Sequence, residues 1–222
     1  MTGFASPPAR IVFDLDGTLI DSAPDIHAIA NLVLAGVGAA PISLPETHRF
    51  IGNGAAVFVA RMRGARGLGD SMQAQLLAEF VALYDTAVTR THPYPGVENA
   101  LRALQADGHR LAVCTNKPQR PARAVLAHLR LDGFFETVLG GDSLTVRKPD
   151  PSPLVAAFEA LGSGPMIYVG DSEVDAETAA RAGVAFLLFT EGYRKTPVAQ
   201  LPHRAAFDDF DALPGLVSDC LA

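Results

Sequence analysis

Two aspartates that stand two positions apart, Asp14 and Asp16, are the residues of this chain best suited to chemistry. They follow the apolar run Ile11-Val-Phe13, which is typical of a buried strand, and precede Gly17 and Thr18. Side chains two apart on a strand project to the same face, toward the crevice beyond the strand's carboxyl end. Two carboxylates this close are stable only with a cation between them, a shared proton or access to water.

Gly17 and Thr18 fit either chemistry or an ordinary turn. A glycine lets the chain turn away without a Cβ, and the threonine hydroxyl can bond a nearby backbone group or carboxylate. Asp and Gly are also common in turns that end a strand. At ordinary residue frequencies the pattern Asp-x-Asp-Gly-Thr arises by chance on the order of a few times in a thousand chains of this length. The motif alone leaves both interpretations open.

Composition limits the class of protein. The chain has 222 residues, 49% hydrophobic and 19% charged, enough for one large domain or a domain carrying an insertion. A formal net charge of −6 argues against nucleic acid or an anionic membrane as partner. Two cysteines suit a reducing compartment, and we find no signal peptide and no apolar stretch long enough to cross a membrane. We therefore expect a cytoplasmic protein.

Alternating apolar runs and helical patterns predict an α/β fold. Continuous apolar runs that indicate buried parallel strands occupy residues 10–13, 110–115, 137–140, 166–170 and 184–189. Helical patterns, each followed by glycine, occupy residues 97–106, 121–131, 152–161 and 173–182. This alternation predicts a Rossmann-like parallel sheet with helices on both faces.

Residues 21–90 break that alternation. They contain no convincing strand, and their helical patterns occupy residues 24–34, 44–50, 55–62 and 71–88. An insertion that enters directly after the paired acids would cover them. We therefore predict an α/β core of residues 1–20 and 91–222 and an inserted, all-helical cap of residues 21–90.

Polar side chains end three more of the predicted strands or follow them in a loop. Thr115 and Asn116 supply neutral donors suited to a phosphoryl oxygen. Lys148 is one of only three lysines and is followed in its loop by two prolines, Pro149 and Pro151, which stiffen the backbone. Asp171 ends another strand, with Asp175 four residues on. Each has an ordinary explanation as a turn, surface or helix-capping residue. Together they would bring hard oxygen ligands and one ammonium to a single crevice, which suits Mg²⁺.

With these motifs the chain resembles the haloacid dehalogenase superfamily of phosphotransferases, in the subgroup that has a helical cap after the first motif. The resemblance covers nearly the whole chain, and its four motifs occur in order: Asp14-Leu-Asp16-Gly17-Thr18, Thr115-Asn116, Lys148-Pro149 and Gly170-Asp171-Ser172 with Asp175.

The resemblance implies that Asp14 is the nucleophile, which takes the phosphoryl group as an aspartyl phosphate, and that Asp16 is the general acid and then the base. It implies a Mg²⁺ ion held by the Asp14 carboxylate, the Asp16 backbone carbonyl and Asp171. Three side chains would hold the phosphoryl oxygens: Thr115, Asn116 and Lys148. Three further residues would support the site: Gly17, Thr18 and Asp175. Asp175 would do so either beside the metal ligands or as a helix cap.

Substrate choice is expected in the cap. Gly52-Asn53-Gly54, preceded by Arg49, forms a glycine-rich turn at a helix start, where free N–H groups favour a carboxylate or phosphate; a tight helix–helix connection would have the same pattern. With Tyr94-Pro95-Gly96-Val97, this turn resembles bacterial phosphoglycolate phosphatases, which implies 2-phosphoglycolate or another small phosphate ester as substrate. After Glu191-Gly192-Tyr193 the chain departs from that pattern, with Arg-Lys-Thr-Pro where Asn-Tyr-Gly is frequent.

Other functions of related cores fit less well. A dehalogenase of this superfamily needs no Mg²⁺ and usually lacks the acid at position 16. A phosphonate hydrolase uses a lysine from the cap, and residues 21–90 contain none. A sugar phosphomutase shares every core motif and is the closest enzymatic alternative, although its cap usually supplies a lysine too. A receiver-like domain that is phosphorylated on aspartate without turnover is disfavoured by the insertion and by Asp16. A monomer and a homodimer are both compatible with the sequence.

Overall fold

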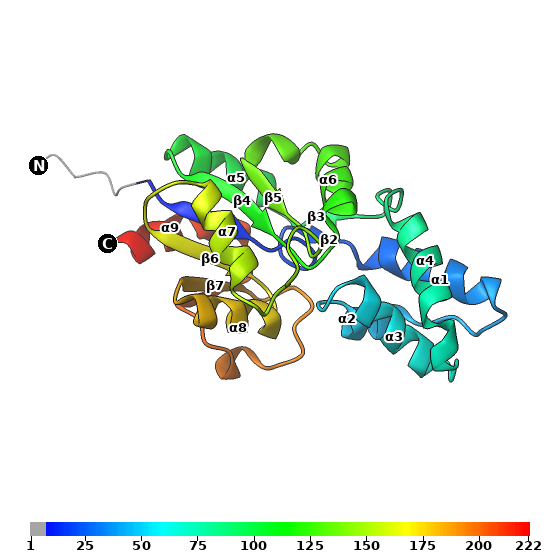
Figure 1. The fold of residues 1–222 in the computed structure, drawn as a ribbon. Coiled ribbons are helices and arrows are strands. Elements are labelled where there is room, and N and C mark those ends of the chain that lie inside the picture. The colour runs from blue at the N-terminus through cyan, green and yellow to red at the C-terminus, as the bar shows by residue number, and fades with distance from the viewer. Residues whose placement is uncertain (1–7) are drawn as a thin grey trace, which may run out of the picture.

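One six-stranded parallel sheet forms the centre of the computed structural model, which describes residues 8–222 (Figure 1). The strand order is β5-β4-β1-β6-β7-β8, and each neighbouring pair is parallel. The strands are β1 (Arg10–Phe13), β4 (Arg110–Cys114), β5 (Thr137–Leu139), β6 (Met166–Gly170), β7 (Ala185–Phe189) and β8 (Ala205–Phe207). Because β1 lies between β4 and β6, the carboxyl ends of these three strands are neighbours.

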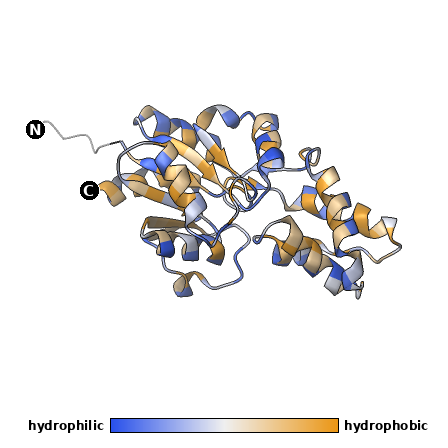
Figure 2. Cartoon of the chain, in the orientation of Figure 1, coloured by the Kyte–Doolittle hydropathy of each residue, from blue (hydrophilic) through white to orange (hydrophobic). Residues whose placement is uncertain are grey.

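Helices cover both faces of the sheet, which confirms the predicted α/β class. Alternate strand residues face opposite sides, so Ile11 and Phe13 belong to one buried cluster and Val12 to another. The first cluster is completed by α5 (Val97–Ala106), α6 (Gln119–His128) and α9 (Leu213–Leu221), and the second by α7 (Ser152–Ala160) and α8 (Glu173–Ala182). Figure 2 shows the strands in largely hydrophobic colours between these layers.

The segment between β2 and β3 forms a separate group of helices at one end of the molecule (Figure 1). It consists of α1 (Ala23–Gly36), α2 (Leu44–Phe50), α3 (Ala55–Ala65) and α4 (Gln73–Tyr84). Their apolar side chains form a hydrophobic core of their own, which Tyr193 joins from the other part of the chain. The helices therefore pack mainly on one another and not on the sheet.

A two-stranded antiparallel ladder joins the two parts. Strand β2 (Ile20–Asp21) leads into the helices, and β3 (His92–Pro93) leads back to the sheet beside it. We propose on this basis that residues 21–90 are a cap domain and that residues 1–20 and 91–222 are the core, of which residues 1–7 lie outside the described part.

Every predicted helix and strand is present, with ends that differ by a few residues. Three features were not predicted: the β2–β3 ladder, β8 and α9. The ladder and β8 are too short to show a periodic pattern, and α9 contains Pro214 and Gly215, which are rare inside helices but tolerated near a helix start. Within residues 8–222 no helix combines the length and the apolar character that crossing a bilayer requires.

If the cap has its own core, weakening that core should loosen the cap alone. Met62 is fully buried among the cap helices, so Met62→Ala is expected to cost about 2–5 kcal/mol of stability. Hydrogen exchange should accelerate in α1, α3 and α4 and change little in β1, β4 and β6. Leu101→Ala, buried in α5 against the sheet, is the matched control and should do the reverse. Equal acceleration in both parts of Met62→Ala would contradict the division.

Candidate active site

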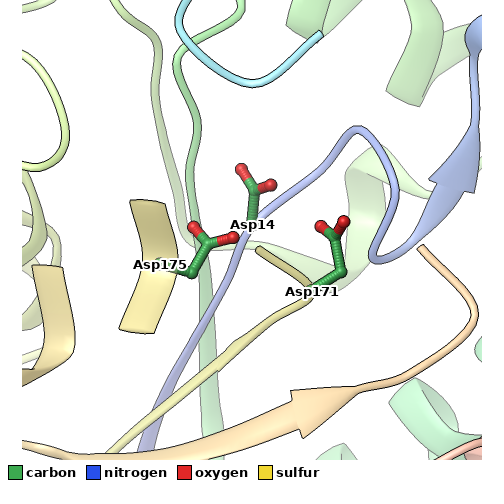
Figure 3. A group of neighbouring side chains, drawn as sticks. All are labelled: Asp14, Asp171 and Asp175. Carbon is green, nitrogen blue, oxygen red and sulfur yellow. The ribbon is translucent and has the colours of Figure 1, made fainter. Parts of the chain in front are cut away.

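The ends of β1 and β6 bring three aspartates together. Asp14 follows β1, Asp171 follows β6, and Asp175 lies in the first turn of α8. The three side chains surround one space in Figure 3, and one carboxylate oxygen of each lies within 4.8 Å of the others. All three are buried, so water screens their mutual repulsion poorly. The cluster therefore requires positive charge.

Lys148 supplies that charge from the loop before α7. Its Nζ donates to Asp14 Oδ1 and Asp175 Oδ1, each at 2.7 Å, and to the Tyr168 hydroxyl at 2.8 Å. An ammonium has three protons, so these bonds use all of them and fix the lysine in place. Burial disfavours the ammonium, but Asp14 and Asp175 outweigh burial and keep the pKa of Lys148 above its usual value.

One ammonium does not balance three buried carboxylates. Burial raises the pKa of Asp14 to about 7 against the opposing charge of Lys148, with Asp175 adding to the rise. Burial also raises the pKa of Asp171 well above its usual value, and the charges of Asp175 and Asp14 add to this. Although burial opposes it, Lys148 and neighbouring hydrogen bonds hold the pKa of Asp175 below its usual value. The excess of negative charge fits a divalent cation beside Asp14 and Asp171.

Asp171 is held by the loop that follows β1. Its Oδ1 accepts from the Thr18 hydroxyl at 2.8 Å, and its Oδ2 accepts from the Tyr193 backbone N–H at 2.6 Å. Gly17 has a φ of 93°, and a Cβ there would lie 2.6 Å from Asp171 Oδ2. Only glycine allows this approach. Gly17 and Thr18, both expected from the sequence to support the site, therefore contact Asp171. Tyr193, which also holds Asp171, was not predicted.

Asp175 combines the two roles that its sequence position suggested. Its backbone N–H bonds the Ser172 hydroxyl, and its Oδ2 accepts from the Ser172 N–H and hydroxyl, which makes a capping box at the start of α8. Its Oδ1 accepts from Lys148 and from the Tyr168 hydroxyl at 2.6 Å. Because its oxygens are already engaged, Asp175 positions Lys148 and is less available to a metal than Asp14 or Asp171.

Asp16 lies on the cap side of the cluster and has a different cation. Its Oδ1 accepts from the Ser22 hydroxyl at 2.5 Å and from Lys117 Nζ at 3.1 Å. Lys117 also donates to the Tyr84 hydroxyl at 3.0 Å and lies 4.1 Å from the centre of that ring. Tyr84 ends α4, so this contact joins core to cap. Lys117 was not assigned a role from the sequence, although it is a rare lysine directly after Thr115 and Asn116.

Thr115 and Asn116 lie where predicted, at the end of β4. The Thr115 hydroxyl accepts from the Lys117 backbone N–H at 3.1 Å, which leaves its own proton free to donate. The Asn116 amide donates to the Lys148 carbonyl at 2.9 Å and to the Gly52 carbonyl of the cap at 3.1 Å. Asn116 therefore braces the Lys148 loop and holds the cap turn.

A cavity of about 340 Å³ lies between these strand ends and the cap. Its core side includes Asp14, Asp16, Thr115, Asn116, Lys117, Lys148 and Asp171. Its cap side combines apolar side chains with the predicted turn: Ile26, Ile51, Gly52, Asn53, Gly54, Phe58, Phe80 and Tyr84. Two further cations, Arg61 and Lys195, also line it. Residues 21–90 thus form one wall of a partly open cavity over the acids.

The structure does not bring Arg49, one of the candidates for the substrate site, to this cavity. In α2 the buried residue is Thr47, and Arg49 lies about 200° further around the helix, so its side chain is exposed. The turn that follows does reach the site. Gly54 has a φ of 82°, and a Cβ there would lie 3.2 Å from the Asn116 carbonyl oxygen, so glycine permits close contact of cap and core.

Comparison with known proteins relates this chain to one family. The family model for haloacid dehalogenase-like hydrolases matches residues 11–189. A phosphoglycolate phosphatase of Cereibacter sphaeroides (strain ATCC 17029) is 50% identical over 215 residues, which cover 96% of this chain and 99% of that protein. A phosphoglycolate phosphatase of Rhodospirillum rubrum is 43% identical over 93% of this chain and 89% of its own length.

Solved structures agree with the sequence relatives. The crystal structure of a predicted phosphoglycolate phosphatase from Haemophilus somnus 129PT superposes with a TM-score of 0.88 and 33% identity, over 94% of this chain and 97% of that one. The match spans the sheet, the cap and the strand ends that hold the acids. By family model, sequence relatives and fold, this chain is a member of the haloacid dehalogenase-like hydrolase family.

Proposed function

We propose that this enzyme is a Mg²⁺-dependent phosphomonoester hydrolase that converts 2-phosphoglycolate to glycolate and phosphate through an aspartyl phosphate. The observation that carries the proposal is the pairing of two carboxylates with two separate lysines, Asp14 with Lys148 and Asp16 with Lys117, at the wall of one cavity. The substrate is taken from the names of the relatives. Cys114 and Cys220 are not joined in a disulfide, which suits the cytoplasmic location that we also propose.

Asp14 is the nucleophile in this proposal. Its carboxylate oxygen attacks phosphorus, an O–P bond to Asp14 forms, and the bond from phosphorus to the glycolate oxygen breaks. Lys148 uses one oxygen of Asp14, which leaves the other to attack. Lys148 and the Thr115 hydroxyl also stabilise charge that spreads over the phosphoryl oxygens.

Asp16 moves protons in both halves of the reaction. It first gives its proton to the departing glycolate oxygen and then takes one from the water that attacks the aspartyl phosphate, which frees Asp14 and phosphate. The bond from Lys117 fixes its carboxylate on the cap side of Asp14. Two carboxylates with separate partners can therefore act as nucleophile and proton carrier without exchanging roles.

Asp14 and Asp171 are the side chains that fit a Mg²⁺ ion, with the Asp16 carbonyl as the third protein ligand in our proposal. Hard carboxylate oxygens on a crowded, buried cluster are the donors that this ion prefers. When bound, Mg²⁺ would neutralise charge between the nucleophile and the anionic phosphate.

Asp14→Asn tests the nucleophile and the substrate together. The amide keeps the shape but cannot attack phosphorus, so phosphate release should fall by at least about 10³-fold for both 2-phosphoglycolate and ethyl phosphate. Wild-type enzyme should show the higher kcat/KM for 2-phosphoglycolate. The control Asp208→Asn, at an exposed position, should retain full activity. Ordinary turnover by Asp14→Asn would exclude the mechanism, and wild-type preference for ethyl phosphate would exclude the substrate.

Lys117→Met should impair the proton transfer that Asp16 performs. Without the ammonium, Asp16 loses its buried partner, and kcat/KM for 2-phosphoglycolate should fall about 10²-fold. An aryl phosphate, whose leaving group needs little protonation, should lose about tenfold or less. Tyr84→Phe keeps the ring beside the ammonium and should retain most activity. Equal losses on the alkyl and aryl esters would show that Lys117 does not act through Asp16.

Removal of the metal should abolish activity reversibly. Treatment with a chelator should stop phosphate release, and added Mg²⁺ should restore it and raise the melting temperature of the wild-type protein. Asp171→Asn should raise the Mg²⁺ concentration for half-maximal activity by about 10–100-fold, with Asp208→Asn again as the control. An activity that survives chelation, or an unchanged Mg²⁺ requirement in Asp171→Asn, would contradict the assignment.

A further inference from the structure

Two cations at the cap side of the cavity have no role in the chemistry described above. Arg61 projects from α3 of the cap, and Lys195 projects from the segment after β7 of the core. Both line the cavity that contains Asp14.

Among residues 8–222 neither cation has a carboxylate partner. Arg61 donates to the Phe50 carbonyl at 3.0 Å and to the Asn53 side-chain oxygen at 3.0 Å. Lys195 Nζ donates to the Ile51 carbonyl at 3.1 Å. The Glu173 carboxylate accepts a hydrogen bond from the Lys195 backbone N–H and not from its ammonium. Neutral oxygens thus hold both side chains, and within residues 8–222 neither forms an ion pair.

The two charges also lie close enough to affect one another. Burial lowers the pKa of Lys195 below its usual value, and Arg61 lowers it further, while Glu173 and Asp171 oppose the shift. Arg61 is half-buried and Lys195 is exposed, and two like charges that face one cavity repel each other unless an anion joins them. Both cations contact the same cap turn: Arg61 bonds Phe50 and Asn53, and a Cβ on Gly52, whose φ is 118°, would lie 4.0 Å from Lys195 Nζ.

We propose that Arg61 and Lys195 form a second anion site, which binds the carboxylate of a phosphorylated hydroxy acid while Asp14 faces its phosphate. One cation comes from the cap and the other from the core, so the site is complete only when the cap is closed over the sheet. Substrate carboxylate and cap closure therefore stabilise one another. This proposal rests on the proposed phosphatase function and names the residues that choose its substrate.

Binding of two matched phosphonates tests the site without turnover. In 3-phosphonopropionate a methylene replaces the ester oxygen of 2-phosphoglycolate, and propylphosphonate has a methyl group in place of the carboxylate. Calorimetry with the Mg²⁺-loaded enzyme should show that the wild type binds 3-phosphonopropionate the more tightly. Arg61→Gln and Lys195→Gln should each reduce this ratio of affinities by about tenfold or more, because each removes a charged hydrogen bond.

Two variants control for indirect effects. Arg49→Gln removes an exposed cation of the same cap, which does not line the cavity, and should keep the wild-type ratio. Lys195→Arg keeps the charge and should restore most of the preference that Lys195→Gln loses. A wild-type ratio near one, or equal losses of both ligands in Arg61→Gln and Lys195→Gln, would overturn the proposal, since either result leaves only a structural role for these cations.

Kinetics separate this proposal from the proposed function. If the wild type prefers 3-phosphonopropionate through Arg61 and Lys195 but does not hydrolyse 2-phosphoglycolate, the anion site stands and the proposed substrate is wrong. If it hydrolyses 2-phosphoglycolate and the two variants keep the wild-type ratio of affinities, the proposed function stands and the anion site is wrong.

Discussion

The ammonium of Lys148, bonded to Asp14, Asp175 and Tyr168, is the interaction on which the site depends. Three carboxylates buried at one sheet edge would repel one another strongly in a medium of low polarity. Lys148 compensates part of this repulsion and fixes one oxygen of Asp14. The charge that it leaves unbalanced is what would favour the cation that we propose. The bonds of Lys148 that hold the cluster together thus also set the charge around Asp14.

The fold meets this constraint with rigid elements. Parallel strands β4, β1 and β6 end side by side, so residues distant in sequence reach the same space. The cap is then fastened to that space by contacts with the site itself. Asn116 bonds the Gly52 carbonyl, Lys195 bonds the Ile51 carbonyl, and Lys117 bonds the Tyr84 hydroxyl. These bonds join the proposed cap directly to residues that line the cavity.

Local patterns predicted the sheet, the helices and the acids at the strand ends, because an apolar run that stops at an aspartate is visible in a few residues. Roles that depend on how helices rotate and pack were not visible. Arg49 and Arg61 both stand near the glycine turn, yet Thr47 faces inward and leaves Arg49 outside, while Arg61 follows Phe58 by one turn and lines the cavity. Lys117 and Lys195 gain their roles only from partners far away in the sequence.

The covalent aspartyl phosphate is the central claim, and rapid acid quenching tests it most directly. Enzyme mixed with labelled substrate and Mg²⁺ should be quenched within one turnover, digested and analysed by mass spectrometry. The account predicts a transient phosphoryl group on the peptide that contains Asp14, formed and lost at least as fast as phosphate is released. A peptide that is never labelled would show direct transfer to water, and a label that persists without release would indicate a phospho-acceptor domain; either result would contradict the account.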